Sequence, residues 1–480
     1  MEEDIYYQAM LSRDYRFDGK FFIGVKTTGI YCRPICPARP LRKNIEFYLN
    51  ANEAENAGFR PCMRCRPECA PFSPGWYGKS AVVQRALRVI SMDGYFETSE
   101  DEFALKFGMS ARHLRRLFKE EVGQTPKQIA NNNRLNFSRK LISESHLKVT
   151  TIAMTAGFSS IRRFNDAFKK RFHKSPSEFR KLKPKDDNIG ITFSLSYRPP
   201  FNWEEILKFY AIHRIAGVEK ITDFSYERVF RTSLDIGFIK VVNNEAKSQL
   251  DFQVVTEDTA SLLSITQKLR QMFDLDSDPI IIANCFEKDK GLRKLWEKYP
   301  GLRIARSWDP FEQSICTILG QLVSLKQASS LVEELIEAYG EVVIHPVTKK
   351  EVRLFPTPKV LSKVDLKRVR TTQKRRETIK DFSKLVLKKK IDFNPLQDLD
   401  ELSEKMLEIK GLGPWTADYI RLRGLGDTDA FPKSDLILKR AMEKHKSLDM
   451  ESIRPWRSYV AVYLWKHYAN KLSKIKVSKS

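Results

Sequence analysis

The spacing of hydrophobic and polar residues changes several times along the chain and divides it into regions of different predicted secondary structure. Near the N-terminus, the runs FFIGVKTTGIY and IEFYL alternate as β-strands do. Apolar residues recur at helical spacing over 81–183, whereas strand and helix patterns alternate over 191–275. Two long alternating runs there flank a turn at Asn243 and Asn244. Helical spacing returns over 276–480, so we predict a multidomain, mainly α-helical protein with two small α+β regions.

The C-terminal helical region contains a tight break in the run KGLGPW, at Gly411 and Gly413. Glycine permits a sharp turn, and the helix that follows would start with unpaired backbone N–H groups that suit a phosphate. We therefore expect a helix, a phosphate-binding hairpin and a second helix. Asp435 precedes the next helical run, and the simplest interpretation of an acid at a helix start is a cap.

Two further positions near this hairpin allow more than one interpretation. The apolar helix from Phe311 ends in the run GQLVS, where Leu322 follows Gln321. Leu322 is either buried at the turn or exposed as a wedge. The last helix carries several aromatic residues, including Trp465, and such residues most often serve in packing.

The charge of the chain indicates a polyanionic partner. Its 480 residues include 84 Lys and Arg against 60 Asp and Glu, a net charge of +24. Residues 81–185 alone hold 22 basic and 10 acidic side chains, a net charge of +12. An excess on this scale favours nucleic acid over a small acidic substrate. The N-terminus lacks an apolar core and no apolar run approaches about 18 residues, so we expect a soluble, cytoplasmic protein with no membrane partner.

Five of the seven cysteines fall within 38 residues near the N-terminus, and this clustering favours a metal over disulfides. Two pairs of thiols suit one tetrahedral zinc ion. The predicted ligands are Cys32, Cys36, Cys62 and Cys65. Cys69 lies outside the paired spacing and is interpreted as an incidental or structural thiol. Spacing alone leaves open whether the zinc is purely structural.

The basic region contains the helix–turn–helix pattern twice. The first turn is at Gly108 and the second at Gly157, so the two units lie about 45–50 residues apart and could enter neighbouring major grooves. The second helix of each unit is rich in basic residues. The predicted base contacts are Arg112, Arg115, Arg162 and Asn165.

Two resemblances sharpen this picture for the N-terminal half. TTGIYCRPxCPAR followed by AGFRPCxRC resembles the N-terminal module of the Ada adaptive-response proteins, and GFSSxxxFxxxFKKxFxxSPSEFR resembles the AraC-type DNA-binding domain. The first resemblance implies that Cys32 accepts a methyl group from an alkylated DNA phosphate. A zinc-bound thiolate is a suitable nucleophile, and its methylation would lower the negative charge of the site and raise DNA affinity. No Pro-Cys-His-Arg motif occurs, so direct reversal of O6-methylguanine is not expected.

The second half resembles the AlkA-type 3-methyladenine DNA glycosylases II of the helix–hairpin–helix family. The motifs are PFEQSICTILGQLVS, KGLGPWTADY, AFPKSDLIL and RPWRSYVAVYLW. The resemblance implies that Asp435 is the catalytic aspartate, whose anion stabilises an oxocarbenium-like sugar. It implies a lesion pocket of aromatic π-faces suited to a cationic base, together with an intercalating side chain. The implied pocket residues are Trp415, Tyr419, Trp465, Leu322 and Gln321.

The same resemblance limits the chemistry. Trp415 occupies the place where glycosylases that also cut the strand carry a Schiff-base lysine, so lyase activity is not expected. No cysteine follows Cys316, which excludes the iron–sulfur cluster of some relatives. Gly411 and Gly413 would form the turn that binds a DNA phosphate. A monovalent or divalent cation could also bind at this hairpin. The glycosylase step itself is expected to need no cofactor.

We therefore expect an alkylation-response fusion: a methyl-accepting zinc module, a sequence-specific transcription regulator and a monofunctional glycosylase. The expected domains are 1–75 (zinc module, small α+β), 81–183 (double helix-turn-helix), 184–190 (linker), 191–275 (small TBP-like α+β subdomain) and 276–480 (all-α helix–hairpin–helix domain). Partners would be alkylated and promoter DNA, with RNA polymerase left open and a monomer expected. One alternative is a regulator that binds damage without turnover; another is a repair enzyme that uses its N-terminal modules as a nonspecific clamp.

Overall fold

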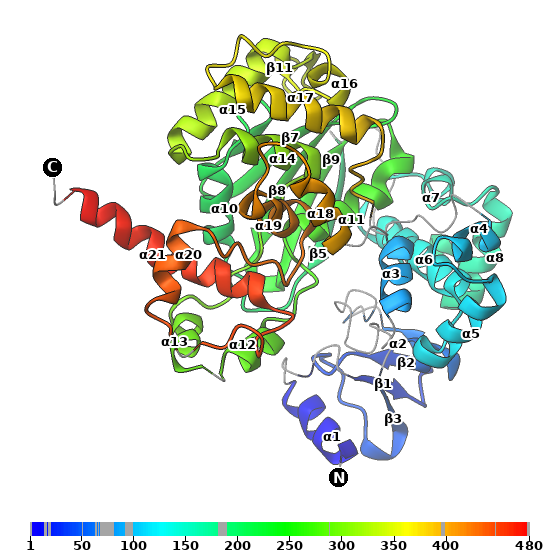
Figure 1. The fold of residues 1–480 in the computed structure, drawn as a ribbon. Coiled ribbons are helices and arrows are strands. Elements are labelled where there is room, and N and C mark those ends of the chain that lie inside the picture. Colours follow the sequence, from blue (N-terminus) through cyan, green and yellow to red (C-terminus); the bar gives the residue numbers. More distant parts are fainter. Residues whose placement is uncertain are drawn as a thin grey trace. The chain divides into compact units, whose positions relative to one another are not determined.

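The computed structural model describes most of the chain, which folds into two compact units (Figure 1). The described residues are 2–13, 17, 21–49, 51–62, 65, 67, 81–91, 99–180, 190–287, 289–394, 399–446 and 448–477. Unit 1 comprises Met1–Arg198, Asn244–Gln253 and Glu257–Gln267, and unit 2 comprises Pro199–Asn243, Val254–Thr256 and Lys268–Ser480. Among the described helices, none is long and apolar enough to cross a membrane.

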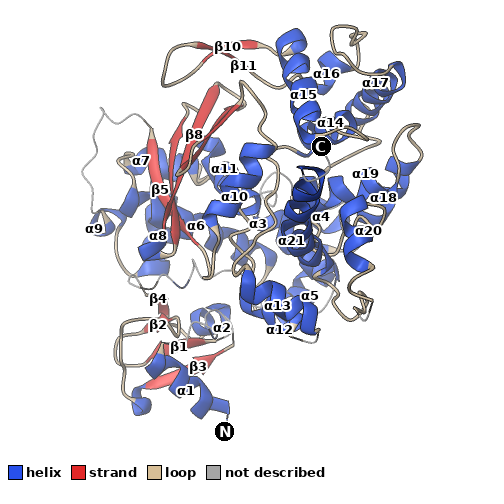
Figure 2. Ribbon diagram, turned by 90° about the vertical axis from the view of Figure 1, so that its left-hand side faces the viewer, coloured by secondary structure: helices blue, strands red, loops and turns tan. Residues whose placement is uncertain are grey.

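Unit 1 begins with a small sheet of order β3-β1-β2-β4, visible among the strands of Figure 2. Its strands are β1 (Phe22–Val25), β2 (Ile30–Cys32), β3 (Ile45–Tyr48) and β4 (Arg60–Pro61), with helices α1 (Glu2–Ser12) and α2 (Ala51–Asn56) and the 3-10 turn η2 (Arg42–Asn44). Because side chains alternate along a strand, Ile23 packs with residues of α1 on one face. Phe22 packs with Tyr31 and with α2 on the other face. This alternation confirms the strands expected from the sequence.

The helical part of unit 1 contains the helix–turn–helix pattern twice. Its helices are α3 (Ala81–Ser91), α4 (Glu100–Leu105), α5 (Ala111–Val122), α6 (Pro126–Glu144), α7 (Val149–Thr155), α8 (Ile161–Phe172) and α9 (Pro176–Phe179). Gly108 and Gly157 adopt φ values of 70° and 73° at the two turns, which glycine tolerates without strain. Ser110 and Ser160 then cap α5 and α8 through their hydroxyl groups. The two predicted units are confirmed. The predicted linker falls outside the described residues except for Gly190.

A five-stranded sheet has the order β5-β9-β8-β7-β6, and the division between the two units passes through it after Asn243. The strands are β5 (Ile191–Ser196), β6 (Glu219–Ile221), β7 (Ser225–Arg231), β8 (Ile236–Asn244) and β9 (Gln249–Val255). The first predicted alternating run is in fact two strands, because the Thr232 hydroxyl accepts hydrogen bonds from the backbone N–H groups of Leu234 and Asp235 and closes a turn. Between β8 and β9 the chain turns through η5 (Glu245–Lys247), one residue beyond the predicted Asn pair.

The remaining elements are mainly helical, as predicted. They are α10 (Trp203–Ile212), η6 (Thr259–Ser261), α11 (Leu262–Met272), α12 (Pro279–Phe286), α13 (Lys290–Lys298), α14 (Pro310–Leu319), α15 (Leu325–Tyr339), α16 (Pro358–Leu361), α17 (Gln373–Leu387), α18 (Leu399–Leu407), α19 (Pro414–Ile420), the π-helical turn η7 (Arg421–Leu425), α20 (Leu436–Met442) and α21 (Arg457–Val477). The prediction missed one hairpin, β10 (Val342–Ile344) with β11 (Glu351–Arg353). It forms because Val343 is buried against Val229 and Leu354.

Among the residues that the structure describes, two large hydrophobic clusters pack the helices of unit 2 from α12 onward. One is formed largely by α14, α15, α17, α18 and α19, and the other by α12, α13, α20 and α21. The helix–hairpin–helix of α18 and α19 belongs to the first core, whereas Asp435 lies at the start of α20 in the second. The candidate catalytic residues therefore lie where elements of the two cores meet.

Candidate functional sites

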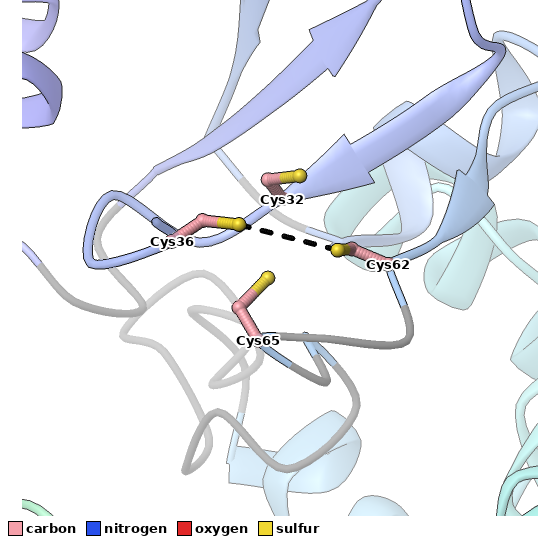
Figure 3. Close-up of side chains that lie close together, drawn as sticks. All are labelled: Cys32, Cys36, Cys62 and Cys65. Atoms are coloured by element: carbon pink, nitrogen blue, oxygen red, sulfur yellow. Dashed lines mark hydrogen bonds between the residues drawn. The ribbon is translucent and has the colours of Figure 1, made fainter. Parts of the chain in front are cut away.

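The four predicted zinc ligands converge on one point in unit 1 (Figure 3). Their Sγ atoms all lie within 4.8 Å of one another, and those of Cys36 and Cys62 are 4.0 Å apart. A tetrahedral zinc ion with Zn–S bonds of about 2.3 Å needs sulfur atoms about 3.8 Å apart, so the four thiols fit the metal. The predicted zinc site is thereby confirmed. Cys69 lies outside the described residues.

Arg33, which follows Cys32 at the end of β2, supports this cluster. Its backbone N–H donates to Cys65 Sγ at 3.3 Å, and its guanidinium donates to the Cys65 carbonyl at 3.1 Å. Hydrogen bonds and a nearby cation stabilise thiolates, and such outer contacts orient metal ligands. Arg33 is 6% exposed, so its charge acts in a poorly solvated environment. Sequence reasoning did not single it out, because an arginine beside a cysteine has no distinctive pattern.

A polar contact joins the zinc module to the second helix–turn–helix within unit 1. Glu55 on α2 accepts hydrogen bonds from the Tyr31 hydroxyl at 2.8 Å, from both terminal nitrogens of Arg171 on α8 at 2.9 and 2.6 Å, and from Asn132 at 3.3 Å. The Glu55 and Arg171 side chains are each 11% exposed. Tyr31 directly precedes Cys32, so the chain that carries this ligand is tied to α8 through one carboxylate.

The four residues predicted to touch bases lie on the exposed faces of α5 and α8. The opposite faces are buried through Leu114 and Phe118 on α5 and through Phe164 and Phe168 on α8. Arg115 is engaged in an ion pair with Glu100 at 3.2 Å. The four residues lie on comparable faces of the two helices, which is compatible with contacts in DNA grooves. Their roles in base contact stay predictions.

The hairpin between α18 and α19 has the predicted sharp turn. Gly411 has a φ of 97°, and a Cβ atom there would lie 2.3 Å from Thr378 Oγ1. Gln321 braces the turn, because its side-chain amide donates to the Gly411 carbonyl at 3.0 Å and to Thr416 Oγ1 at 2.9 Å. Sequence reasoning assigned Gln321 to the lesion pocket; in this structure the side chain contacts the hairpin.

Leu322 follows Gln321 in an unusual conformation. It has a φ of 55° and its side chain is fully exposed. A left-handed backbone is strained for a side chain of this kind, and an exposed leucine gains nothing from burial. Of the two interpretations open from the sequence, burial at the turn is therefore wrong, and the wedge stays a prediction.

Asp435 caps α20 and also binds two indoles. Its Oδ1 accepts the backbone N–H groups of Ile437 and Leu438 at 3.0 and 3.1 Å. Trp465 Nε1 donates to the same oxygen at 3.0 Å, and Trp415 Nε1 donates to Oδ2 at 3.1 Å. The carboxylate is thus fixed in position by four donors, two of them from predicted pocket residues on other helices.

Aromatic rings gather around this carboxylate. Trp415 and Tyr419 stack with centroids 5.3 Å apart at 21°, and Tyr419 meets Trp465 edge-on at 5.8 Å. The structure adds two residues that the sequence did not reveal. Arg423 lies with its guanidinium carbon 5.5 Å from the Trp465 ring centroid and 4.1 Å from that of Phe209 on α10. Phe209 is more than 200 residues from the other members of this cluster, so periodicity could not have linked it to them.

Buried charge also surrounds the end of α19. Burial raises the pKa of Asp418 to about 6, with Arg421 opposing the shift and Asp427 adding to it. The pKa of Tyr419 is raised by burial as well, against the opposing field of Arg423. The region beside the hairpin is therefore poorly solvated, which strengthens every electrostatic interaction within it.

Together these features define a helix–hairpin–helix DNA repair protein joined to a cysteine-ligated zinc module and a helix–turn–helix regulator. Three family models match parts of the chain: the metal-binding domain of Ada over residues 5–68, a helix-turn-helix domain over 103–182 and the AlkA N-terminal domain over 192–309. The probable bifunctional transcriptional activator/DNA repair enzyme AlkA of Mycobacterium tuberculosis is 35% identical over 474 residues, covering 96% of this chain and 95% of that protein. The chain belongs to this family of bifunctional AlkA-type transcriptional activators and DNA repair enzymes.

Two Escherichia coli relatives match separate halves. DNA-3-methyladenine glycosylase 2 is 28% identical over 280 residues, covering 57% of this chain and 96% of that enzyme. The bifunctional transcriptional activator/DNA repair enzyme Ada is 36% identical over 193 residues, covering 40% of this chain and 48% of that protein. The predicted fusion of a glycosylase with an Ada-type regulator is confirmed, and the chain is a DNA repair enzyme that binds DNA.

Proposed function

We propose that unit 2 is a monofunctional DNA-3-methyladenine glycosylase II that excises alkylated purines, with Asp435 as its catalytic carboxylate. The observation that carries this proposal is the position of Asp435, whose oxygens accept both indole N–H groups of the aromatic cluster as well as two backbone N–H groups. A carboxylate held among aromatic rings suits a site where a flipped base stacks and its sugar becomes positively charged.

In this reaction the bond between C1′ and the purine nitrogen breaks, and its electron pair leaves with the base. Asp435 stabilises the positive charge that develops on the sugar, and water then adds to C1′ with loss of a proton. Trp415 lies in the first turn after the hairpin, where a strand-cutting enzyme would need an amine, so the product is an abasic site in an intact strand.

The residues around the cluster support DNA distortion. The exposed Leu322 would fill the space left by the flipped nucleotide, and the hairpin N–H groups after Gly411 would hold a phosphate of the same strand. Gln321 links the hairpin to the turn between α14 and α15 that carries Leu322, through its hydrogen bond to the Gly411 carbonyl. A monovalent or divalent cation bound at the hairpin belongs to the same proposal.

For unit 1 we propose that Cys32 takes a methyl group from a DNA methyl phosphotriester. The sulfur–carbon bond forms as the methyl–oxygen bond breaks, and the phosphate leaves as an ordinary anionic diester. Zinc bound by Cys32, Cys36, Cys62 and Cys65 keeps the thiols deprotonated at neutral pH. Methylation removes one negative charge next to a DNA-binding module, which favours binding to promoter DNA through Arg112, Arg115, Arg162 and Asn165.

The broader organisation belongs to the same proposal. The boundaries at 1–75, 81–183, 191–275 and 276–480 are proposed as the functional domains, in a protein that acts as a monomer in the cytoplasm. Activation of transcription would bring RNA polymerase to the promoter after methylation.

Two assays test the proposal separately. For unit 2, alkylated duplex DNA is incubated with the full chain and the released bases are identified by chromatography; we expect free 3-methyladenine and an uncut abasic strand. Binding without base release would instead support a damage-binding regulator. For unit 1, protein treated with methyl phosphotriester DNA is digested and its peptides are analysed by mass spectrometry. We expect the added methyl group on Cys32. Methyl found only on Cys36, Cys62 or Cys65 would overturn that assignment.

A further inference from the structure

The peptide group that precedes the exposed Leu322 is held by an arginine from another helix of unit 2. Arg375 lies in the first turn of α17, and its guanidinium donates a hydrogen bond to the Gln321 carbonyl. The Arg375 side chain is half-buried, and its guanidinium is always charged. The turn that carries Leu322 is therefore tied to α17 by a charge-assisted hydrogen bond.

This bond acts directly on the backbone of Leu322. A peptide group is planar, so a hydrogen bond to its carbonyl restrains rotation of the whole group. The Gln321 carbonyl belongs to the group that leads into Leu322, and the bond thus restrains the φ angle of Leu322, which is 55°. Such a left-handed conformation costs about as much free energy as one hydrogen bond to a charged group contributes. Burial does not offset this cost, because the Leu322 side chain is fully exposed.

The same helix also holds the hairpin. One turn further along α17, the Thr378 hydroxyl donates to the Lys410 carbonyl at 2.9 Å. Residues three positions apart lie on one face of a helix, so a single face of α17 contacts both the turn that carries Leu322 and the hairpin. The Gln321 side chain joins these two segments directly, through its bond to the Gly411 carbonyl at 3.0 Å. The position of Leu322 relative to the hairpin is thereby fixed from α17.

We infer that Arg375 is a positioning residue for base flipping, which holds Leu322 in its projecting conformation before DNA binds. The inference rests on the proposed glycosylase function, with Leu322 as the wedge, and goes beyond it by naming the residue that prepares the wedge. A side chain that is already in place loses less conformational freedom when it enters the DNA. In this role Arg375 acts through Leu322 and takes no part in breaking the bond to the base.

A double-mutant cycle in the full chain tests this role. A duplex with a single 7-methylguanine opposite cytosine is incubated with excess protein, and the single-turnover rate of base release is measured. Arg375→Ala should lower this rate about tenfold. In the Leu322→Ala background the same substitution should change the rate less than about twofold, because the side chain that Arg375 positions is gone. An unchanged rate in Arg375→Ala, or a further tenfold fall in the double variant, would overturn the inference.

A second duplex separates positioning from a structural role. A mismatched base leaves the stack more easily, so with 7-methylguanine opposite thymine the fall in Arg375→Ala should be about threefold or less. Equal falls on both duplexes would give Arg375 a role in folding or in bond breaking and overturn the inference.

Arg376 supplies the matched control, because its guanidinium donates to a backbone carbonyl away from the wedge, that of Val369, at 3.0 Å. Arg376→Ala should keep the rate within about twofold of the wild type. A fall as large as that of Arg375→Ala would assign the effect to α17 as a whole and refute the role of Arg375.

Failure of the proposed function has a different signature. If the wild type releases no base from either duplex, the proposed glycosylase falls and the inference with it. If the wild type releases the base and Leu322→Ala is equally active, the wedge and the inference fall while the proposed excision stands.

Discussion

Replacing Asp435 by asparagine tests the glycosylase site most directly. In the native structure Oδ1 accepts three N–H groups and Oδ2 accepts the Trp415 indole at 3.1 Å. An asparagine that keeps its oxygen toward the three donors must turn its NH2 group toward Trp415. Two donors then face each other, and a lost hydrogen bond of this kind costs about 1–3 kcal/mol of stability.

The expected effect on catalysis is larger. The variant loses the only charge that we assign to stabilising the oxocarbenium-like sugar. Removal of a preorganised electrostatic group commonly costs about 3–4 kcal/mol of transition-state stabilisation, or about 10²–10³ in rate. Because Asp435 carries a full charge in a poorly solvated site, its removal should lower the rate by an amount at or above the upper end of this range. The assay is single-turnover release of 3-methyladenine, with binding to the same duplex measured by fluorescence anisotropy.

Asp289 supplies the matched control, because its side chain caps α13 through the same pattern of hydrogen bonds. Its Oδ1 accepts the N–H groups of Gly291 and Leu292 at 2.8 and 2.9 Å, as Asp435 does from the corresponding positions. Asparagine caps helices about as well as aspartate, so Asp289→Asn should change activity less than about twofold. If Asp435→Asn retained excision within tenfold of the wild type, or if Asp289→Asn lost as much activity, the catalytic assignment would be refuted.

Three further predictions concern the hairpin, a buried acid and the zinc module. Gly411→Ala should lower the free energy of unfolding by about 1–3 kcal/mol and weaken DNA binding, because φ is 97° and the new Cβ would lie 2.3 Å from the Thr378 hydroxyl oxygen. Gly413→Ala is the control: its new Cβ would have no atom within 4 Å, so urea unfolding should show nearly unchanged stability. Burial raises the pKa of Asp418 to about 6, so the stability linked to its protonation is present in acid and is lost as the pH rises through about 6. The free energy of unfolding of Asp418→Asn should therefore be about 1–3 kcal/mol higher than that of the wild type at pH 8 and equal to it near pH 4. A variant as stable as the wild type at both pH values would contradict this prediction. Glu55→Gln leaves the Arg171 guanidinium buried without its counter-charge, and thermal unfolding should show unit 1 destabilised by about 2–4 kcal/mol.

Features set by local sequence were predictable. The four zinc ligands follow from cysteine spacing, and the two helix–turn–helix units follow from helical periodicity broken at Gly108 and Gly157. The hairpin at Gly411 follows from glycine chemistry. In each case the signal lies within a short stretch, where backbone geometry or metal coordination restricts which residues fit.

Contacts between distant polar residues were not predictable. The bond of Glu55 to Arg171 joins positions 116 residues apart, and that of Gln321 to Gly411 joins positions 90 apart. A single buried polar pair has no period and no fixed spacing, so nothing in one sequence distinguishes it from solvated side chains. The β10–β11 hairpin was missed for a related reason, because its short strands are stabilised by burial of Val343 against other parts of unit 2.

For Asp435, the capping seen in the structure and the proposed catalytic role do not exclude each other. Its two backbone hydrogen bonds are those of an ordinary helix cap, and they hold the carboxylate at the N-terminal end of α20. The two indole donors then bring the total to four, three of them on Oδ1 and one on Oδ2. These four hydrogen bonds fix the carboxylate in position. The geometry therefore fits the proposed role of Asp435, in which a carboxylate fixed in position stabilises the positive charge that develops on the sugar.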